Sequence, residues 1–314
     1  MNKLAEVLHD TELIFRKAGF QVSERCTSRP SCFDLVTKKG KKLVFVKVHD
    51  DVGNVSTKDA SEVQAISECF TATPLFISDK TRKKPLEDDT VYSRCNICTV
   101  TLKTLEDIIS HRKQPLIEAG PGGYYVRLNG EAIRKKRLEL GLSVGKLAEM
   151  MGVSRRTLYG YEKDMAKASV SAAYCLEWIL GIPAARSINV FESPSQGTGF
   201  FATARRIITK HYFLQMVLKK FAQFNFDVAP TKRAPFDFIA RDSRNSLNVV
   251  GGVPHKGEQN VDQRTEEIVS IGKIINAQPI FVTDGRQVPE NGIRMIRSED
   301  LEEIEHPEEF IAQF

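Results

Sequence analysis

Residues 142–164, LSVGKLAEMMGVSRRTLYGYEKD, carry the pattern that decides the fold of the centre of this 314-residue chain. A short helix can begin after Ser143, whose hydroxyl is a good N-cap, and end at Gly152, because glycine adopts the left-handed conformation cheaply. Ser154 can cap a second helix. Apolar residues at helical spacing are expected to face inward: Leu147, Ala148, Met151, Leu158 and Tyr161. The stretch therefore predicts two short helices joined by a tight turn.

Two further helices are predicted around this pair, over residues 130–140 and 170–180, with Asn129 and Ser169 as their caps. The last helix is expected to place in the core Leu176, Trp178, Ile179 and Leu180. This order of caps, turn and core residues indicates a helix-turn-helix, whose second helix enters the major groove of DNA. The residues expected to contact DNA are Ser143, Lys146, Ser154, Arg155, Arg156, Thr157, Tyr159 and Lys163.

The segment resembles the helix-turn-helix of the phage lambda repressor, the Cro/C1 type. The resemblance implies a glutamine that binds a phosphate at the start of the domain's second helix. Val144 and Gly145 stand there in this sequence, and Lys146 is expected to make the contact instead. A helical bundle that only assembles proteins is the alternative interpretation of the same pattern.

The charge of the chain supports a polyanion as the partner of the central segment. The net charge is +5, and residues 131–167 hold nine basic residues against five acids. The basic residues are Arg134, Lys135, Lys136, Arg137, Lys146, Arg155, Arg156, Lys163 and Lys167. Basic charge concentrated on a helix-turn-helix is typical of DNA binding. The acidic stretch 302–309 is expected to be an ordinary solvated surface.

Other sequence features concern location and metal binding. The first fifteen residues lack the basic head and apolar run of a signal peptide, and no apolar stretch approaches the roughly 18 residues of a membrane span. We therefore expect a cytoplasmic protein with no membrane contact, whose six cysteines are free thiols. Cys95 and Cys98 have the spacing of half a zinc site, but Cys98 is expected to begin a strand. No metal and no cofactor is expected.

The flanking segments predict two similar α/β domains. In the first, helices are expected over residues 4–18, 58–70 and 105–110, and strands over 33–37, 42–48, 73–78 and 99–102. The C-terminal third repeats this order at an offset of about 203 to 205 residues, most clearly where PIFVTD at 279–284 answers PLFISD at 74–79.

The predicted fold class is therefore α+β and multi-domain. The expected domains are residues 1–113, the helix-turn-helix at 124–186, and residues 200–314, with linkers at 114–123 and 192–199. The helix expected to open the third domain spans 207–223. An extended segment at 124–128 is expected either to pack on the helical domain or to pair with its copy in a dimer.

The repeated unit resembles a restriction-endonuclease core. That fold places an aspartate on one strand and Glu-x-Lys on the next, where two carboxylates hold Mg²⁺ and the lysine steadies the attacking water. Asp34 and Lys47 fit this pattern and are expected close together, but Phe45 stands at the second acid. Asp237 is the acid of the second copy, with Val249 and Gly251 expected at the other two positions. Acids that could substitute in the first copy are Asp50, Asp51 and Glu62. We expect two degenerate copies without catalytic residues.

Nearly all of the chain resembles one archaeal family of helix-turn-helix transcriptional regulators, through the stretches YYVRLNGEAIRKKRLELGLS, APFDFIA and PIFVTDG. The resemblance implies a regulator that binds a double-stranded DNA operator, and assigns no activity to the flanking domains. We expect a homodimer held by those domains and no enzyme activity. The alternatives are a nuclease of DNA repair or defence that the helix-turn-helix directs to DNA, and an adaptor that recruits proteins.

Overall fold

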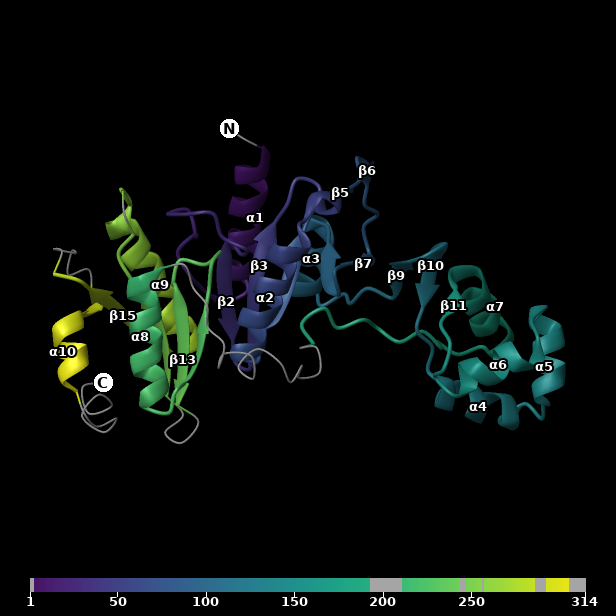
Figure 1. Ribbon diagram of the computed structural model, residues 1–314. Helices are drawn as coiled ribbons and strands as arrows, with labels where there is room; N and C mark the ends of the chain where they lie inside the picture. The colour runs from purple at the N-terminus through teal and green to yellow at the C-terminus, as the bar shows by residue number, and fades with distance from the viewer. Residues whose placement is uncertain (1–2, 193–210, 243–246, 256, 286–291, 305–314) are drawn as a thin grey trace. The chain divides into compact units, whose positions relative to one another are not determined.

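The computed structural model (Figure 1) describes residues 3–192, 211–242, 247–255, 257–285 and 292–304. The chain divides into two compact units. Unit 1 comprises residues 1–49, 55–76 and 191–314, and unit 2 comprises residues 50–54 and 77–190. The expected linker at 192–199 lies, apart from its first residue, outside the described residues. Among the described helices, none combines the length and apolar character needed to cross a membrane.

The N-terminal half of unit 1 is a small sheet with two helices. Its elements are α1 (Lys3–Lys17), β1 (Gln21–Val22), β2 (Leu35–Lys39), β3 (Lys42–Val48), α2 (Thr57–Cys69) and β4 (Thr73–Ile77). The strands lie in the order β1-β2-β3-β4, and the first three are antiparallel. The expected elements of this half are confirmed to within two residues. Their apolar strand residues are buried on both faces of the sheet, as the near-continuous apolar runs indicate.

The C-terminal half of unit 1 follows the same strand plan. Its elements are α8 (Tyr212–Gln223), β12 (Asp227–Pro230), β13 (Phe238–Asp242), β14 (Leu247–Gly252), α9 (Val261–Ile275), β15 (Gln278–Thr283), β16 (Arg294–Arg297) and α10 (Ser298–Glu303). The strand order is β12-β13-β14-β15-β16, antiparallel as far as β14 and parallel from there. The first residues of the helix expected at 207–223 lie outside the described residues. The core of this half gathers around Phe221 and Phe238, which are fully buried.

A glutamate on α9 ties the two halves of unit 1 together. Glu267 is 1% exposed and accepts hydrogen bonds from the backbone N–H groups of Thr27 and Ser28, each at 2.8 Å. The Ser28 hydroxyl donates to its other oxygen at 2.6 Å. A carboxylate removed from water needs several donors, and the loop before β2 supplies them.

The reverse contact is made by a glutamate on α2. Glu62 accepts hydrogen bonds from the backbone N–H groups of Lys232 at 2.5 Å and Arg233 at 2.7 Å, in the loop before β13. Glu62 and Glu267 are 205 residues apart, and so are their respective partner loops. The two halves thus contact each other through equivalent elements, as the two subunits of a symmetric dimer do.

Unit 2 combines a second run of strands with helix α3 and a four-helix part. The strands β7 (Thr90–Arg94), β8 (Ile97–Val100), β9 (Ile117–Gly120), β10 (Gly123–Val126) and β11 (Ala168–Ser169) lie in the order β8-β7-β9-β10-β11. Helix α3 (Leu102–Ser110) follows β8, η1 (Val52–Asn54) is a 3₁₀ turn, and β5 (Lys80–Thr81) pairs with β6 (Lys84–Pro85). The expectation that 114–123 is only a linker is wrong, because β9 lies in it and forms a hairpin with β10. Strand β10 also pairs with β11, so the segment 124–128 packs on the helical part.

The helical part of unit 2 has the predicted four helices, α4 (Gly130–Glu139), α5 (Val144–Met151), α6 (Arg155–Glu162) and α7 (Val170–Leu180). Its core contains Leu147, Ala148, Leu158, Tyr161, Leu176 and Leu180. Gly152 ends α5 with φ of 67°, as the turn requires. The assignment of Trp178 to the core is wrong: it is 79% exposed. Helix α7 is apolar on most sides, so its sequence does not mark which face is inward.

Candidate nucleic-acid interface

The first turn of α6 is the candidate base-reading surface. The Ser154 hydroxyl accepts a hydrogen bond from the Thr157 N–H at 3.0 Å and so caps the helix. Arg155 and Arg156, the first two residues of the helix, are exposed, and Tyr159 is 53% exposed. Leu158 and Tyr161 are buried on the opposite side and fix how the helix is rotated. This rotation directs two arginines into solvent at the positively polarised end of a helix.

The remaining predicted contact residues lie at the start of α5 and at the far end of α6. Ser143 caps α5 by accepting from the Lys146 N–H at 3.0 Å, and the Lys146 side chain reaches Glu149 at 3.1 Å. The Lys163 ammonium lies 5.9 Å from the centre of the Tyr159 ring, at the far end of α6. The Lys146–Glu149 pair is exposed, so water screens it and the lysine can exchange its partner for a phosphate.

Gly145 departs from the resembled repressors, and the structure gives a local reason. A Cβ built at Gly145 would lie 2.9 Å from Nε of Arg155. The Arg155 side chain therefore rests over the start of α5, and a larger residue at position 145 would displace its guanidinium end. Arg156, the next residue of the helix, is exposed.

A buried ion pair fixes α4 to α6. Arg137 and Glu162 have 7% and 5% exposed side chains, and two guanidinium nitrogens reach the carboxylate at 2.5 and 3.0 Å. The third nitrogen donates to the Leu142 carbonyl at 2.8 Å. Arg137 therefore does not contribute to the basic surface, although the sequence counts it among the basic residues. Gly130 lets α4 approach the end of α6, because a Cβ there would meet the Glu162 backbone at 2.6 Å.

The aspartate of the N-terminal half, Asp34, lies beside Lys47 as predicted. The Lys47 ammonium reaches one carboxylate oxygen at 2.6 Å and the Ser31 carbonyl at 2.9 Å. The Val48 N–H donates to the other oxygen at 2.8 Å. Phe45 is fully buried and packs edge-on against Phe33 at 5.0 Å between ring centres. The position where the resemblance to an endonuclease core expects a second acid thus belongs to an apolar core.

The aspartate of the C-terminal half, Asp237, is held by the same backbone pattern. Its N–H donates to Gly251 and its carboxylate accepts from the Val253 N–H, both at 2.7 Å; the N–H of Asp34 donates to Val46 at 2.8 Å. The strand pairs Leu35–Val46 and Phe238–Gly251 are therefore equivalent. This register corrects the predicted one by a residue: the equivalents of Phe45 and Lys47 are Val250 and Gly252, not Val249 and Gly251. Neither can bind a cation through its side chain.

Two guanidinium groups surround Asp237. Arg264 on α9 is fully buried and contacts one carboxylate oxygen, while Arg29, from the N-terminal half, reaches the other at 2.8 Å. His255 lies 2.9 Å from that second oxygen. Burial alone would raise the pKa of Asp237, but Arg264, His255 and Arg29 together hold this pKa well below its usual range. Positive charge from the protein thus occupies the surroundings of this carboxylate.

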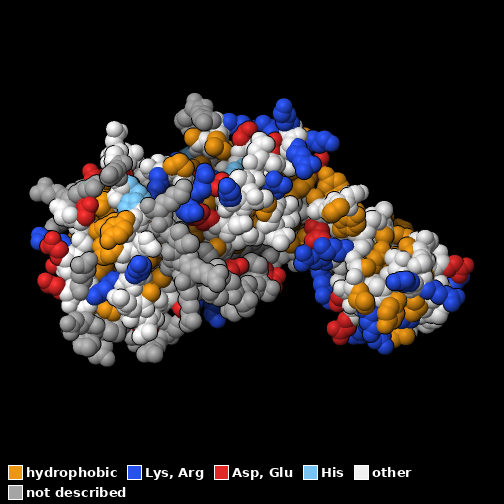
Figure 2. Space-filling view, in the orientation of Figure 1, with side chains coloured by type: hydrophobic (Ala, Val, Ile, Leu, Met, Phe, Trp, Pro, Cys, Tyr) orange, Lys and Arg blue, Asp and Glu red, His pale blue; other side chains and the backbone are white. Residues whose placement is uncertain are grey.

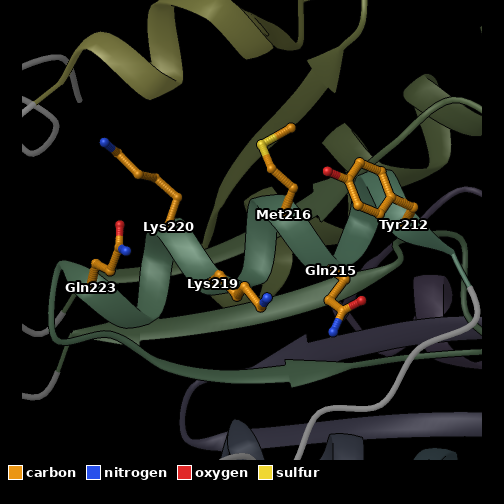
Figure 3. A pocket seen from close by; sticks show the side chains of 6 residues that line it. All are labelled: Tyr212, Gln215, Met216, Lys219, Lys220 and Gln223. Atoms are coloured by element: carbon orange, nitrogen blue, oxygen red, sulfur yellow. The ribbon is translucent and has the colours of Figure 1, made fainter.

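The predicted substitute acids have other partners. Asp51 accepts from three backbone N–H groups, Asp50 lies 3.6 Å from Lys80, and Glu62 bonds the loop before β13. No group of three acids, histidines or cysteines suited to a metal occurs among the described residues, and the cysteines are free. A hollow of about 310 Å³ runs along α8 (Figure 3). Its lining residues, Tyr212, Gln215, Met216, Lys219, Lys220 and Gln223, include no acid and no cysteine.

Sequence comparisons agree with this geometry. Residues 133–184 match the helix-turn-helix family, and residues 4–115, which include Asp34 and Lys47, match the PD-(D/E)XK superfamily domain. The class of protein is thus one that joins a helix-turn-helix to a PD-(D/E)XK domain and a second mixed sheet. No solved structure gave a significant match.

Full-length relatives place the chain in a family. A "putative HTH-type transcriptional regulatory protein" of Methanosarcina barkeri is 31% identical, over 97% of this chain and 94% of its own length. Proteins of the same name from Methanococcoides burtonii and Methanocaldococcus jannaschii are 31% and 28% identical, over 89% and 90% of this chain and 86% and 87% of theirs. The chain belongs to this family of archaeal HTH-type transcriptional regulatory proteins.

Proposed function

We propose that the protein is a sequence-specific DNA-binding transcriptional regulator that reads its operator with the first turn of α6. The observation that carries this proposal is the pair of exposed arginines, Arg155 and Arg156, next to the Ser154 cap. An arginine fork matches O6 and N7 of guanine, so one of the two is expected to specify a guanine. Thr157 and Tyr159 would contact neighbouring base edges, and Lys146 and Lys163 the phosphates.

The test begins with operator selection from a random duplex library, followed by binding measurements on single variants. Arg156→Ala is expected to weaken operator binding by about 1–3 kcal/mol and to relax the preference at one base pair. Arg155→Ala is the matched comparison, because its guanidinium already contacts α5. Lys146→Ala should instead weaken binding to every sequence alike. If both arginine variants kept wild-type affinity and preference, α6 would not be the base-reading element.

We further propose that two copies bind a palindromic operator, because one short half-site gives little specificity in a genome. The surfaces of the two halves that face each other are used within unit 1, so dimer contacts would fall on the other surfaces of the α/β domains. Light scattering at micromolar concentration should give twice the mass of one chain. A monomer with one protein per operator would contradict this.

We propose that neither aspartate site cleaves DNA and that the protein acts in the cytoplasm without metal or cofactor. The match to the PD-(D/E)XK superfamily leaves catalysis open. The support for the proposal is chemical, since Phe45 and Val250 stand where a nuclease needs its second carboxylate. We also favour DNA binding over an adaptor role, and a steep fall of DNA affinity with rising salt would separate them.

A further inference from the structure

The hairpin of β5 and β6 in unit 2 has an unusual turn. Lys80 pairs with Pro85 and Thr81 with Lys84, which leaves a two-residue turn formed by Arg82 and Lys83. Their φ angles are 49° and 66°, both in the left-handed region. Turns of this type normally contain Asn-Gly or another pair that adopts this conformation cheaply. Two consecutive long basic residues here are strained, and such strain persists where the surroundings enforce it.

The enforcing group is the carboxylate of Asp51. Its Oδ1 accepts from the Arg82 N–H at 2.8 Å and its Oδ2 accepts from the Lys83 N–H at 2.7 Å. Gly53 also donates to Oδ1 at 2.8 Å, and a Cβ on Gly53 would lie 2.6 Å from the Arg82 nitrogen. Asp51 is only 9% exposed. The segment 50–54 thus fixes the backbone of the turn through these hydrogen bonds.

The basic side chains at this turn point into solvent. Arg82, Lys83 and Lys84 are exposed, and none of them forms an ion pair with another residue that the structure describes. Figure 2 shows Lys and Arg side chains gathered over the region of β5 and β6. Arg82, Lys83 and Lys84 thus place three adjacent positive charges at the end of the hairpin.

Another basic turn in the same chain shows that basic residues do not require this strain. The turn between β2 and β3 also carries lysines, but Gly40 takes its left-handed position, with φ of 58°. The Lys39 ammonium donates to the Ala18 carbonyl at 2.5 Å and lies 5.7 Å from the Phe20 ring centre. That turn is relaxed and its lysine contacts its own domain. The Arg82–Lys83 turn is strained, and its charged groups form no ion pair with a residue that the structure describes.

We propose that the β5–β6 hairpin is a second DNA-contact element, which binds phosphates of the duplex through Arg82, Lys83 and Lys84. The proposal rests on the proposed DNA-binding function, and the hairpin belongs to the same compact unit as the helix-turn-helix. Asp51 already binds the backbone N–H groups of the turn, so the side chains must make the contacts with DNA. Because these contacts are with phosphates, they carry no base specificity. The hairpin therefore adds affinity on any sequence, beside the selective contacts of α6.

The sharpest variant is Arg82→Asn/Lys83→Gly, which removes two charges and introduces the residues that the turn prefers. Thermal unfolding of the full chain should show equal or higher stability than wild type. DNA binding, measured by fluorescence anisotropy on operator and random duplexes, should weaken on both. The slope of log K against log salt should fall by about 0.9 for each phosphate that the variant no longer neutralises, or roughly 2 in total. A residue that matters only for folding would not give higher stability together with a smaller slope.

The control is Lys39→Ala/Lys41→Ala, which removes the same charge from the relaxed turn and should leave the slope unchanged. An unchanged slope in the hairpin variant, or an equal fall in the control, would overturn the proposal. If the hairpin variant kept its DNA affinity but failed to bind poly-glutamate, the hairpin would be a site for acidic proteins instead. Arg156→Ala measured in parallel separates the two claims. If Arg156→Ala weakens binding and the hairpin variant does not, only the hairpin proposal is refuted. If the wild-type protein does not bind DNA, the proposed function and the hairpin proposal are both refuted.

Discussion

The two aspartates of unit 1, Asp34 and Asp237, occupy equivalent places in two similar sheets but have different partners. Asp34 retains the lysine of a nuclease motif, and its carboxylate is bonded by Lys47 and one backbone N–H. Asp237 has Gly252 in place of that lysine and is bonded by Arg264, Arg29 and His255. The first site resembles a catalytic site without one of its acids. The second has become a structural ion cluster, in which one half of unit 1 supplies a cation to the other.

The largest expected effect is on the free energy of unfolding when each of the two aspartates is replaced by alanine. Asp237→Ala removes the carboxylate that Arg29 and the fully buried Arg264 share, and leaves Arg264 only its pair with Glu258 at 2.9 Å, so it should cost about 3 kcal/mol. Asp34→Ala breaks a more exposed pair and should cost about 1–3 kcal/mol. Amide hydrogen exchange of α9 and of β3 reports the two losses locally. Equal losses would mean that the two sites are energetically alike.

The same cluster predicts a dependence on pH. The pKa of Asp237 is lower in the folded protein than the value of about 4 in an unfolded chain, so the folded state favours the charged form. The stabilisation is therefore complete above about pH 4 and is lost as the pH falls further, toward the folded pKa. The stability difference between wild type and Asp237→Ala should shrink in that acidic range. A constant difference would contradict the ion cluster.

An intermediate effect on the free energy of unfolding is expected from the two glutamates that link the halves of unit 1. Glu267→Ala removes a buried carboxylate that accepts from the N–H groups of Thr27 and Ser28, in partly buried hydrogen bonds, and should cost about 1–3 kcal/mol. Glu62→Ala is its matched control at the equivalent position, where the bonds are exposed, so water can replace the carboxylate and the cost should be about 1 kcal/mol or less. Urea unfolding of both variants measures the difference. A larger loss at Glu62 would reverse the proposed asymmetry.

The smallest effect is expected from divalent metal. Wild-type protein should show no change in Tm with Mg²⁺ or Mn²⁺, and no nicking of plasmid DNA. Phe45→Glu places a carboxylate in an apolar core, so it should lower Tm, and Mn²⁺ should recover a few degrees because two carboxylates make a site for a hard cation. Phe45→Gln is the control and should not respond to Mn²⁺. Cleavage by wild type would restore Asp34 to a catalytic role.

Much of the helical part follows from local chemistry. Ser143, Ser154 and Ser169 cap the helices they were expected to cap, because the hydroxyl and the N–H that it accepts from are three residues apart. Trp178 was misplaced because a helix that is apolar on most sides has no periodicity to read. Strands β7 and β9 were missed because both are short and carry polar or glycine residues that resemble a loop.

The partners of Asp237 could not be predicted from the sequence. Arg29 lies 208 residues away and follows no motif, so only the packing of the two halves brings it to the carboxylate. The register of β14 was misjudged because Gly251 and Gly252 give no side chain by which to align the strand. Local caps are determined within a few residues, whereas ion pairs between distant segments depend on the whole fold.

The link between Ser28 and Glu267 also bears on the order of synthesis. The two residues are 239 positions apart, and the whole of unit 2 is made between them. At about 5–20 residues per second, the N-terminal half waits on the order of tens of seconds for its partner. The four helices α4 to α7 need no such partner and can fold on the ribosome first. During that interval the loop before β2 has no carboxylate to bind. We therefore expect chaperones to bind most often to nascent chains that stop before α9.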